Sequence, residues 1–372
     1  MFKIALKFII FDKAKSFGAL FGVIISVFLI GQQTGIFLFL TGAMSRLVSG
    51  NQGVLWVVDS KTTNVNALGQ LDTRIGYQIQ SIKGVKKVYP MVIAAGSAKF
   101  ANGKSAGMSI IGTQAPDFVG GPWNIFNGTK DMLLQDGALS TDFFDAKALG
   151  DLKPGEYFEI NGKKVFNAVQ TKGVRGFGGI YAFTTVERAR MLGKISNNKV
   201  SAFLVKYEKG ADSVAIKKAI NEHIFGVKAW TSPEFDAITV KTVLGTSGIA
   251  LSIGTMIVFA TIAGFVIIGL TLYSATIDRI KDYGTLKAIG ATNAYIRNII
   301  LMQATIFALV GFVLGYALVE GFRNGIAKAG TIFHYTPTLQ LALFGITLII
   351  SISGTLFAIR RIVKLEPAAV FR

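Results

Sequence analysis

The sequence predicts a membrane protein with four transmembrane α-helices and a large mixed α/β extracytoplasmic domain between the first and second helix. Three observations predict this fold class. Hydrophobic residues make up 51% of the chain and charged residues only 16%, which is too apolar for an ordinary soluble domain. Four apolar segments are long enough to cross a bilayer. Residues 42–245, which have the charge density of a soluble domain, separate the first apolar segment from the second.

The apolar segments set the predicted domain boundaries. Each holds roughly 20 apolar residues or more, and a helix of that length matches a hydrocarbon core about 30 Å thick. The expected parts are an amphipathic N-terminal segment (1–15), the first span (16–41), the extracytoplasmic domain (42–245), the second span (246–276), a cytoplasmic loop (277–298), the third span (299–320), a short outer loop (321–338), the fourth span (339–359) and a cytoplasmic tail (360–372).

The orientation follows from Lys and Arg near the spans, because cytoplasmic loops carry an excess of these residues. Three short segments are rich in them: Lys3, Lys7, Lys13 and Lys15 before the first span, Arg279, Lys281, Lys287 and Arg297 after the second, and Arg360, Arg361, Lys364 and Arg372 after the fourth. We therefore expect a multi-pass protein of the bacterial inner (plasma) membrane with both termini in the cytoplasm. The first apolar run is too long for a signal peptide and predicts an uncleaved anchor.

The extracytoplasmic domain is predicted to contain two strand, helix, strand units that flank a middle part. The first unit has a strand at 54–58, a helix at 68–82 and a strand at 85–95, and the second has the same order at 200–207, 211–223 and 227–231. Alternating apolar residues and helical spacing support these assignments. The middle part, 99–183, contains short strands separated by Gly. We expect two lobes, one from the outer units and one from the middle part.

Composition argues against several classes of function. The chain has no Cys, which excludes disulfides and thiolate metal sites. Its net charge is +18, but the Lys residues of the extracytoplasmic domain are scattered, so nucleic acid is not an expected partner. His223 and His334 lack nearby carboxylates with metal-ligand spacing. The run Gly103, Lys104 and Ser105 resembles the end of a phosphate-binding loop, but the motif's first Gly is missing. We expect no catalytic residue, no metal and no cofactor in this chain.

Small residues four apart in the spans predict close helix packing. The pairs are Gly31 with Gly35 in the first span and Gly311 with Gly315 in the third. Such pairs let helix backbones approach one another where lipid removes the hydrophobic driving force. Gln32 and Gln33 lie between the first pair, and amides in hydrocarbon require partners. We predict that Gly31 and Gly35 let the first span approach either its copy in a second chain or the second span. Gly311 and Gly315 of the third span are the alternative site of the interface.

The cytoplasmic loop is the most informative short segment, and it reads IDRIKDYGTLKAIGATNAYIRN over residues 277–298. It opens with alternating charges and continues as a short amphipathic stretch containing Tyr283, Leu286 and Ile289. Such a stretch lies along a membrane surface and offers its polar side to a cytoplasmic partner. A plain positively charged loop is the simpler alternative.

This loop resembles that of the MacB-like and FtsX-like permeases of ABC transporters, whose pattern places acidic, basic, Gly and apolar residues in a fixed order. The matching positions are Asp278, Arg279, Asp282, Gly284, Leu286, Lys287, Ala288, Ile289 and Gly290. Asp278 and Asp282 stand where the family has Glu. The order of spans, the segment LDTRIGYQIQSIKGVKKVYP and the tail LEPAAVFR are also similar to the family. In length and in lacking a fused ATPase, the chain looks most similar to DevC-type permeases.

The resemblance implies a permease without its own nucleotide-binding motif, bound to a separate ATP-binding subunit that holds ATP and Mg. Asp278, Arg279, Asp282 and Lys287 would contact that subunit, while Gly284 and Gly290 would permit the turns that seat it. The family further implies a homodimer, contact with membrane lipid and, for DevC-like members, a periplasmic adaptor of the membrane-fusion type and an outer-membrane channel. ATP-driven motion would pass through the helices to the outer domain, which is mechanotransmission leading to efflux.

Two other classes have the same layout. A LolC-like lipoprotein-releasing permease or a haem-exporting permease would take a lipidic ligand from the bilayer. An FtsX-like regulator would pass force to a cell-wall hydrolase. The large outer domain favours transport, and the sequence does not name the substrate.

Overall fold

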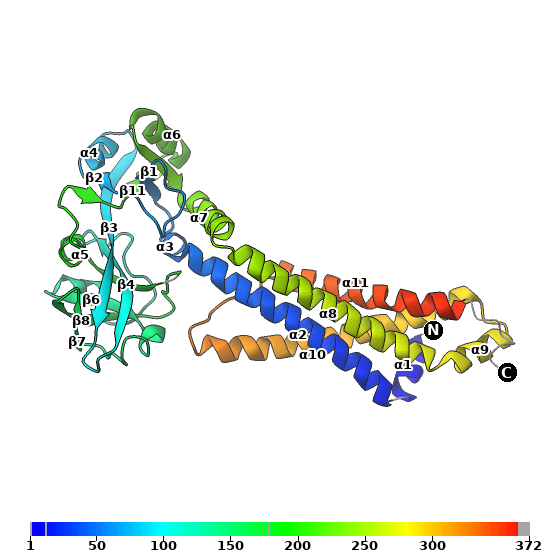
Figure 1. The fold of residues 1–372 in the computed structure, drawn as a ribbon. Helices are drawn as coiled ribbons and strands as arrows, with labels where there is room; N and C mark the ends of the chain where they lie inside the picture. Colours follow the sequence, from blue (N-terminus) through cyan, green and yellow to red (C-terminus); the bar gives the residue numbers. More distant parts are fainter. Residues whose placement is uncertain (1, 12, 178, 364–372) are drawn as a thin grey trace. The chain divides into compact units, whose positions relative to one another are not determined.

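The computed structural model describes residues 2–11, 13–177 and 179–363. Two compact units make up the chain, one from residues 1–38 with 249–372 and one from residues 39–248. The first is helical and the second contains the β-sheet (Figure 1). The predicted segment LEPAAVFR, residues 365–372, lies outside the described residues, as do Lys364 and Arg372.

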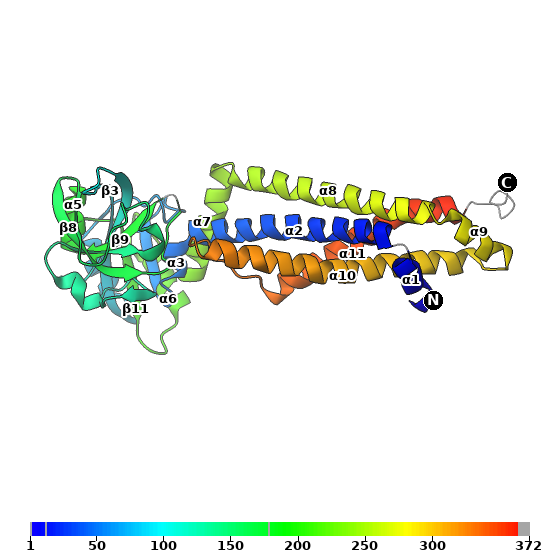
Figure 2. The same cartoon turned by 90° about the horizontal axis from the view of Figure 1, so that it is seen from below.

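The helical unit contains the segments that the sequence predicts as spans, and they run side by side in both views (Figures 1 and 2). Its helices are α1 (Phe2–Phe11), α2 (Lys13–Met44), α8 (Ile249–Ile277), α9 (Ile280–Ala288), α10 (Asn293–Ala327) and α11 (Pro337–Val363). By length and composition, α2, α8, α10 and α11 can each cross a membrane. The structure thus shows four candidate membrane helices and confirms that part of the predicted fold class.

Helices α2, α10 and α11 are longer than the predicted spans, whereas α8 is slightly shorter than the predicted second span. The 35 residues of α10 extend about 52 Å at 1.5 Å per residue, against a hydrocarbon core of about 30 Å. The predicted third span stops at residue 320 because charge begins there. The helix nevertheless continues to Ala327, and Arg323 forms an ion pair of 2.6 Å with Glu320 one turn earlier. At its start, the Thr292 hydroxyl accepts a hydrogen bond from the Tyr295 amide, which caps the helix.

The outer unit begins with the last residues of α2 and is built around one large sheet. Its helices are α3 (Arg46–Ser49), α4 (Ile75–Gln80), α5 (Val186–Gly193), α6 (Ser213–His223) and α7 (Ser232–Thr246), with 3-10 turns η1 (Lys130–Leu134) and η2 (Phe143–Asp145). Its strands are β1 (Leu55–Asp59), β2 (Leu71–Asp72), β3 (Val85–Lys99), β4 (Ser105–Thr113), β5 (Ile125–Asn127), β6 (Ala138–Asp142), β7 (Tyr157–Ile160), β8 (Lys163–Thr171), β9 (Ile180–Thr185), β10 (Lys199–Val200), β11 (Ala202–Tyr207) and β12 (Val227–Thr231).

The two predicted strand, helix, strand units combine into one antiparallel layer in the order β12, β1, β11, β3. With α4 and α6 as crossovers, this is the ferredoxin-like arrangement. Both faces of β1 are buried. Leu55 and Val57 join the cluster beneath α4 and α6, whereas Trp56 and Val58 join the cluster with Phe235 of α7. Burial on both sides explains why residues 54–58 read as a continuous apolar run.

The middle part joins the same sheet through β3. The first half of β3 pairs with β11, and its second half pairs with β4 in the register Met91 to Thr113 through Lys99 to Ser105. The two groups of elements expected as lobes are both present, and β3 belongs to both. The helix expected at 68–82 is limited to Ile75–Gln80, because Asp72 accepts hydrogen bonds from the Arg74 amide and guanidinium and forms a turn.

Candidate functional site

The segment predicted as the cytoplasmic loop contains a short helix, α9, between two turns. The chain leaves α8 at Ile277, turns through Asp278 and Arg279, and begins α9 at Ile280. After Ala288 it turns again at Gly290, whose φ of +99° favours Gly. Because both connections are short, α9 is tied closely to the ends of α8 and α10.

One side of α9 packs into the helical unit. Tyr283 is fully buried, and its cluster includes Ala5 of α1 and Ile296, Ile299 and Ile300 of α10. The Tyr283 hydroxyl donates to Oε1 of the buried Gln303 at 3.4 Å. Burial raises the pKa of Tyr283 to about 12. The buried side therefore fixes α9 against α1 and α10.

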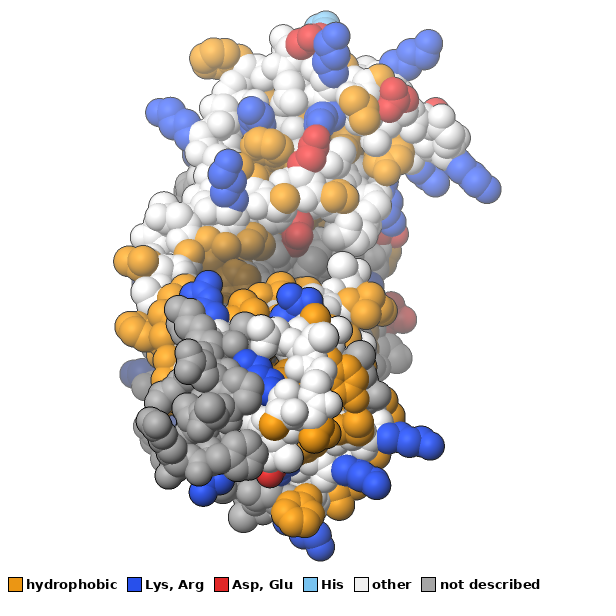
Figure 3. Space-filling view, turned by 90° about the vertical axis from the view of Figure 1, so that its right-hand side faces the viewer, with side chains coloured by type: hydrophobic (Ala, Val, Ile, Leu, Met, Phe, Trp, Pro, Cys, Tyr) orange, Lys and Arg blue, Asp and Glu red, His pale blue; other side chains and the backbone are white. Residues whose placement is uncertain are grey.

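The opposite side of α9 is exposed. It carries Lys281, Asp282, Thr285, Ala288 and, just after the helix, Ile289, with the spacing of one helix face. Ile289 is 76% exposed, although the sequence groups it with Tyr283 and Leu286. At the end of the molecule that carries α1 and α9, hydrophobic side chains are exposed beside Lys and Arg (Figure 3). A surface that mixes charge with an exposed aliphatic side chain suits a protein partner.

The four charged residues predicted as contacts do not share one environment. Asp278 and Asp282 are exposed, whereas Arg279 and Lys287 are half-buried. The Arg279 guanidinium lies 5.2 Å from the centroid of the Phe8 ring in α1. Arg279 therefore faces α1, whereas the predicted contact of these four residues with the ATP-binding subunit stays a prediction.

The two glycines of this segment also differ. Gly290 lies at a turn, as expected, but Gly284 lies inside α9 and is buried. Its predicted role in a turn is wrong. Gly284 lies next to Tyr283 on the buried side of α9, where a residue without a side chain needs little space.

The glycine pairs of the spans form a seam between α2 and α10 of the same chain. A Cβ on Gly31 would lie 2.6 Å from Cγ2 of Val319, and one on Gly311 would lie 2.5 Å from Cγ1 of Val23. A Cβ on Gly315 would lie 2.8 Å from Cβ of Val27. Each contact advances by four residues on both helices, so ridges of one helix fill grooves of the other.

The atoms nearest to a Cβ on Gly31 belong to the third span, α10, and those nearest to a Cβ on Gly35 belong to the segment after it, so these glycines do not face the second span, α8. The alternative of packing against a second copy of the chain stays a prediction. Gly35 is closed by the rings of Phe333 and Tyr335, and the Tyr335 hydroxyl donates to the Gly31 carbonyl oxygen at 2.6 Å. Gln32 and Gln33 are half-buried on the neighbouring faces of α2. Their proposed part in a dimer interface remains a prediction.

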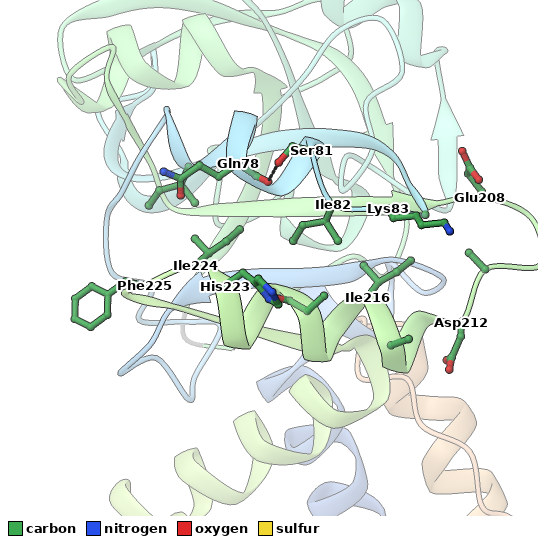
Figure 4. A pocket seen from close by; sticks show the side chains of 15 residues that line it. Gln78, Ser81, Ile82, Lys83, Glu208, Asp212, Ile216, His223, Ile224 and Phe225 are labelled. Atoms are coloured by element: carbon green, nitrogen blue, oxygen red, sulfur yellow. Dashed lines mark hydrogen bonds between the residues drawn. The ribbon is translucent and has the colours of Figure 1, made fainter.

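The outer unit carries a groove of about 1080 Å³ between α4 and α6 (Figure 4). Its apolar floor includes Ile82, Ile216 and Ile224, and its rim carries Lys83 and Asp212. Phe225, two residues after the end of α6, also lines the groove and is fully exposed. Among the described residues, no group of His, Asp and Glu side chains has the arrangement of a metal site.

Comparison with known proteins identifies the helical unit. Residues 254–367 match the family model described as "FtsX-like permease C-terminal", and this range holds most of α8, all of α9 and α10, and α11. This range, which is less than half of the chain, is similar to the C-terminal domain of FtsX-like permeases. The match agrees with the predicted family, whereas the DevC-type assignment stays a prediction. Helix α9 with its exposed face lies inside the matched range.

Two relatives of part of the chain are permeases by name. One is a putative hemin transport system permease protein, HrtB, of Staphylococcus haemolyticus, 22% identical over 117 residues that cover 32% of this chain and 33% of the relative. The other is an uncharacterized ABC transporter permease of Mycobacterium tuberculosis, 26% identical over 121 residues that cover 32% and 34%. The chain thus aligns with about a third of the length of these relatives.

Two solved structures are similar to about half of the chain. The periplasmic region of MacB from Actinobacillus actinomycetemcomitans shares 12% identity over 54% of this chain and 96% of that one, with a TM-score of 0.40. The extracellular domain of the transporter YknZ from Gram-positive bacteria shares 14% identity over 48% and 98%, with a TM-score of 0.35.

Proposed function

We propose that this chain is the permease subunit of an ABC transporter of the MacB and DevC type, which couples ATP hydrolysis by a separate subunit to export or extraction of a substrate on the outer side of the inner membrane. The observation that carries the proposal is the match of residues 254–367, which include α9, to the FtsX-like permease family. ATP and Mg would be held by the partner subunit.

The geometry of α9 supports coupling by movement. The ATP-binding subunit would meet the exposed face that holds Asp282, Thr285 and Ile289. Because α9 is joined to α8 and α10 by short turns, a displacement of α9 moves the ends of two long helices. The 29 residues of α8 extend about 44 Å, far enough to carry that displacement across a bilayer.

A test of this proposal is co-purification of the full chain from membranes with a tag on the chain. We expect an ATP-binding-cassette subunit to accompany the chain and to hydrolyse ATP faster in the complex than alone. Isolation of the chain with no nucleotide-binding subunit, under conditions that preserve the four-helix unit, would contradict the proposal.

The other partners are part of the same proposal. A second copy would complete a homodimer, and the exposed apolar face of α8, with Phe259, Ile262 and Val266, is available to that copy or to lipid. A periplasmic adaptor of the membrane-fusion type would dock on the outer unit, where the groove between α4 and α6 offers an apolar floor beside the exposed Phe225. Replacing Phe225 with Ser should weaken such docking and leave the ATPase subunit bound.

Haem export is a second candidate, because one relative is named a putative hemin transport permease. Deleting the gene should then make cells sensitive to hemin. Unchanged hemin tolerance would remove this candidate and leave lipoprotein release, regulation of a cell-wall hydrolase and efflux of other substrates.

A further inference from the structure

The N-terminal helix α1 lies against the coupling helix through Phe8. The rings of Phe8 and Tyr283 are stacked, with centroids 5.7 Å apart and planes 10° apart. The Arg279 guanidinium lies over the same Phe8 ring at 5.2 Å. Arg279 is the residue just before α9, and its carbonyl oxygen accepts a hydrogen bond from the Tyr283 amide at 3.2 Å. Phe8 thus contacts the start of α9 twice, by ring stacking on Tyr283 and by a cation–π interaction with Arg279.

Helix α1 is held in place by contacts of its buried face and of its C-terminal end. Ala5 is fully buried in the cluster with Tyr283 and the first turns of α10. The Ser16 hydroxyl donates to the Ile9 carbonyl oxygen at 2.7 Å, which fixes the bend between α1 and α2. On its outer face, α1 exposes Phe11, which is 93% exposed. Together with Lys3 and Lys7, an exposed aromatic side chain is typical of a helix that lies in the membrane interface.

We propose that α1 orients α9 for the ATP-binding subunit, with Phe8 as the positioning residue that holds Arg279 and Tyr283. This inference rests on the proposed function. It assigns Arg279 to the contact with α1 instead of the contact with the ATPase. When the ATP-binding subunit displaces α9, α1 and α9 then move together as one rigid body. The membrane surface restrains this motion through α1.

An alternative is that Phe8 only fills space beside Tyr283. A space-filling role needs an apolar side chain of similar size, whereas the proposed role also needs the flat ring that stacks on Tyr283 and faces the guanidinium. Leu and Tyr at position 8 separate these roles, because Leu keeps apolar volume and Tyr keeps the ring. The matched control is Phe11→Leu, since Phe11 lies on the same helix and is exposed.

The first experiment measures ATP hydrolysis by the complete complex in proteoliposomes, and the affinity of the permease for the ATPase subunit. We expect Phe8→Leu to lower the stimulation of hydrolysis about tenfold even with saturating ATPase subunit, because a stack and a cation–π contact are lost together. Phe8→Tyr and Phe11→Leu should behave like the parent. Parent-like stimulation by Phe8→Leu, or a loss shared by Phe8→Tyr, would overturn the proposal.

The second experiment does not depend on weakening the fold. Because the chain has no Cys, Ile4→Cys in α1 and Leu286→Cys in α9 together place two unique thiols for a bifunctional reagent to join. Both side chains pack against the cluster of Ala5 and Tyr283, and the changes leave Phe8, Arg279 and Tyr283 in place. If α1 and α9 move as one body, the cross-linked complex retains its stimulated hydrolysis. Failure to cross-link, or loss of hydrolysis after cross-linking, would overturn the inference. In contrast, a chain that never binds an ATPase subunit, with or without these changes, would remove the proposed function itself.

Discussion

Replacing Gly315 with Ala should separate α2 from α10. An added Cβ would lie 2.8 Å from Cβ of Val27 and 2.9 Å from the carbonyl oxygen of Ile24. The second of these is a backbone atom, so no side-chain rotation relieves the contact. Overpacking of this kind costs about 1–3 kcal/mol, whereas Gly to Ala in a helix gains about 1 kcal/mol in propensity.

A matched control removes the propensity term. Gly321 also lies in α10, and nothing lies within 4 Å of a Cβ placed there. The difference in the free energy of unfolding between Gly315→Ala and Gly321→Ala should therefore equal the cost of the clash, about 1–3 kcal/mol, or about 5- to 150-fold in the equilibrium constant.

Thiol labelling during titration with SDS measures this difference. Ala308 of α10 is fully buried, and Ala308→Cys in this Cys-free chain provides a single reporter that becomes reactive when α10 leaves its neighbours. Gly315→Ala should shift the midpoint to lower SDS, and Gly321→Ala should not. Equal midpoints for the two variants would refute the seam between α2 and α10.

Three further predictions address topology, coupling and the outer unit. In intact cells, an impermeant label should react at a Cys placed within residues 96–104 but not at Lys281→Cys, and the reverse pattern would overturn the orientation. Asp282→Lys should uncouple ATP hydrolysis from transport with the outer unit still folded, because charge reversal adds repulsion to the loss of an exposed contact; unchanged transport would exclude Asp282 as a contact. Burial raises the pKa of Asp145 to about 6, despite an ion pair of 2.8 Å with Arg175. Protonation is therefore favoured in the folded state, so this group's contribution to stability is present below about pH 4 and is lost as pH rises through 6. The free energy of unfolding should therefore fall by about 3 kcal/mol over this pH range. Unfolding followed by tryptophan fluorescence should show that Asp145→Asn removes this pH dependence. The same pH dependence in the parent and in Asp145→Asn would contradict the assignment to Asp145.

Much of the fold could be predicted from the sequence because its signals are local. Long apolar runs define the four spans, and the apolar run at 54–58 marks the central strand β1. The outer helix α6 begins where Asp212 suggests, and the Asp212 side chain accepts from the Val214 amide. Helix α7, which is not among the predicted elements, also has a local start signal, because Thr231 and Glu234 form a capping box.

The parts that could not be predicted depend on contacts between distant segments. Nothing in the loop sequence shows that Arg279 faces a ring in α1, because Phe8 lies more than 250 residues away. The spacing of Gly31 and Gly35 predicts a close approach but does not name the partner helix. The complementary step of four residues on α10, with Gly311, Gly315 and Val319, identifies the partner only once the helices are aligned. The same limit applies to β3, whose membership in both halves of the sheet depends on register.

Site-specific photocross-linking from α9 tests the central claim most directly. A photoreactive residue at Asp282, which is exposed on α9, should form an adduct with an ATP-binding subunit in the native membrane. The same residue at Gly103, in the outer unit, should not. An adduct from Asp282 that contains no nucleotide-binding protein, or an ATPase adduct from Gly103, would contradict the account of α9 as the cytoplasmic coupling helix.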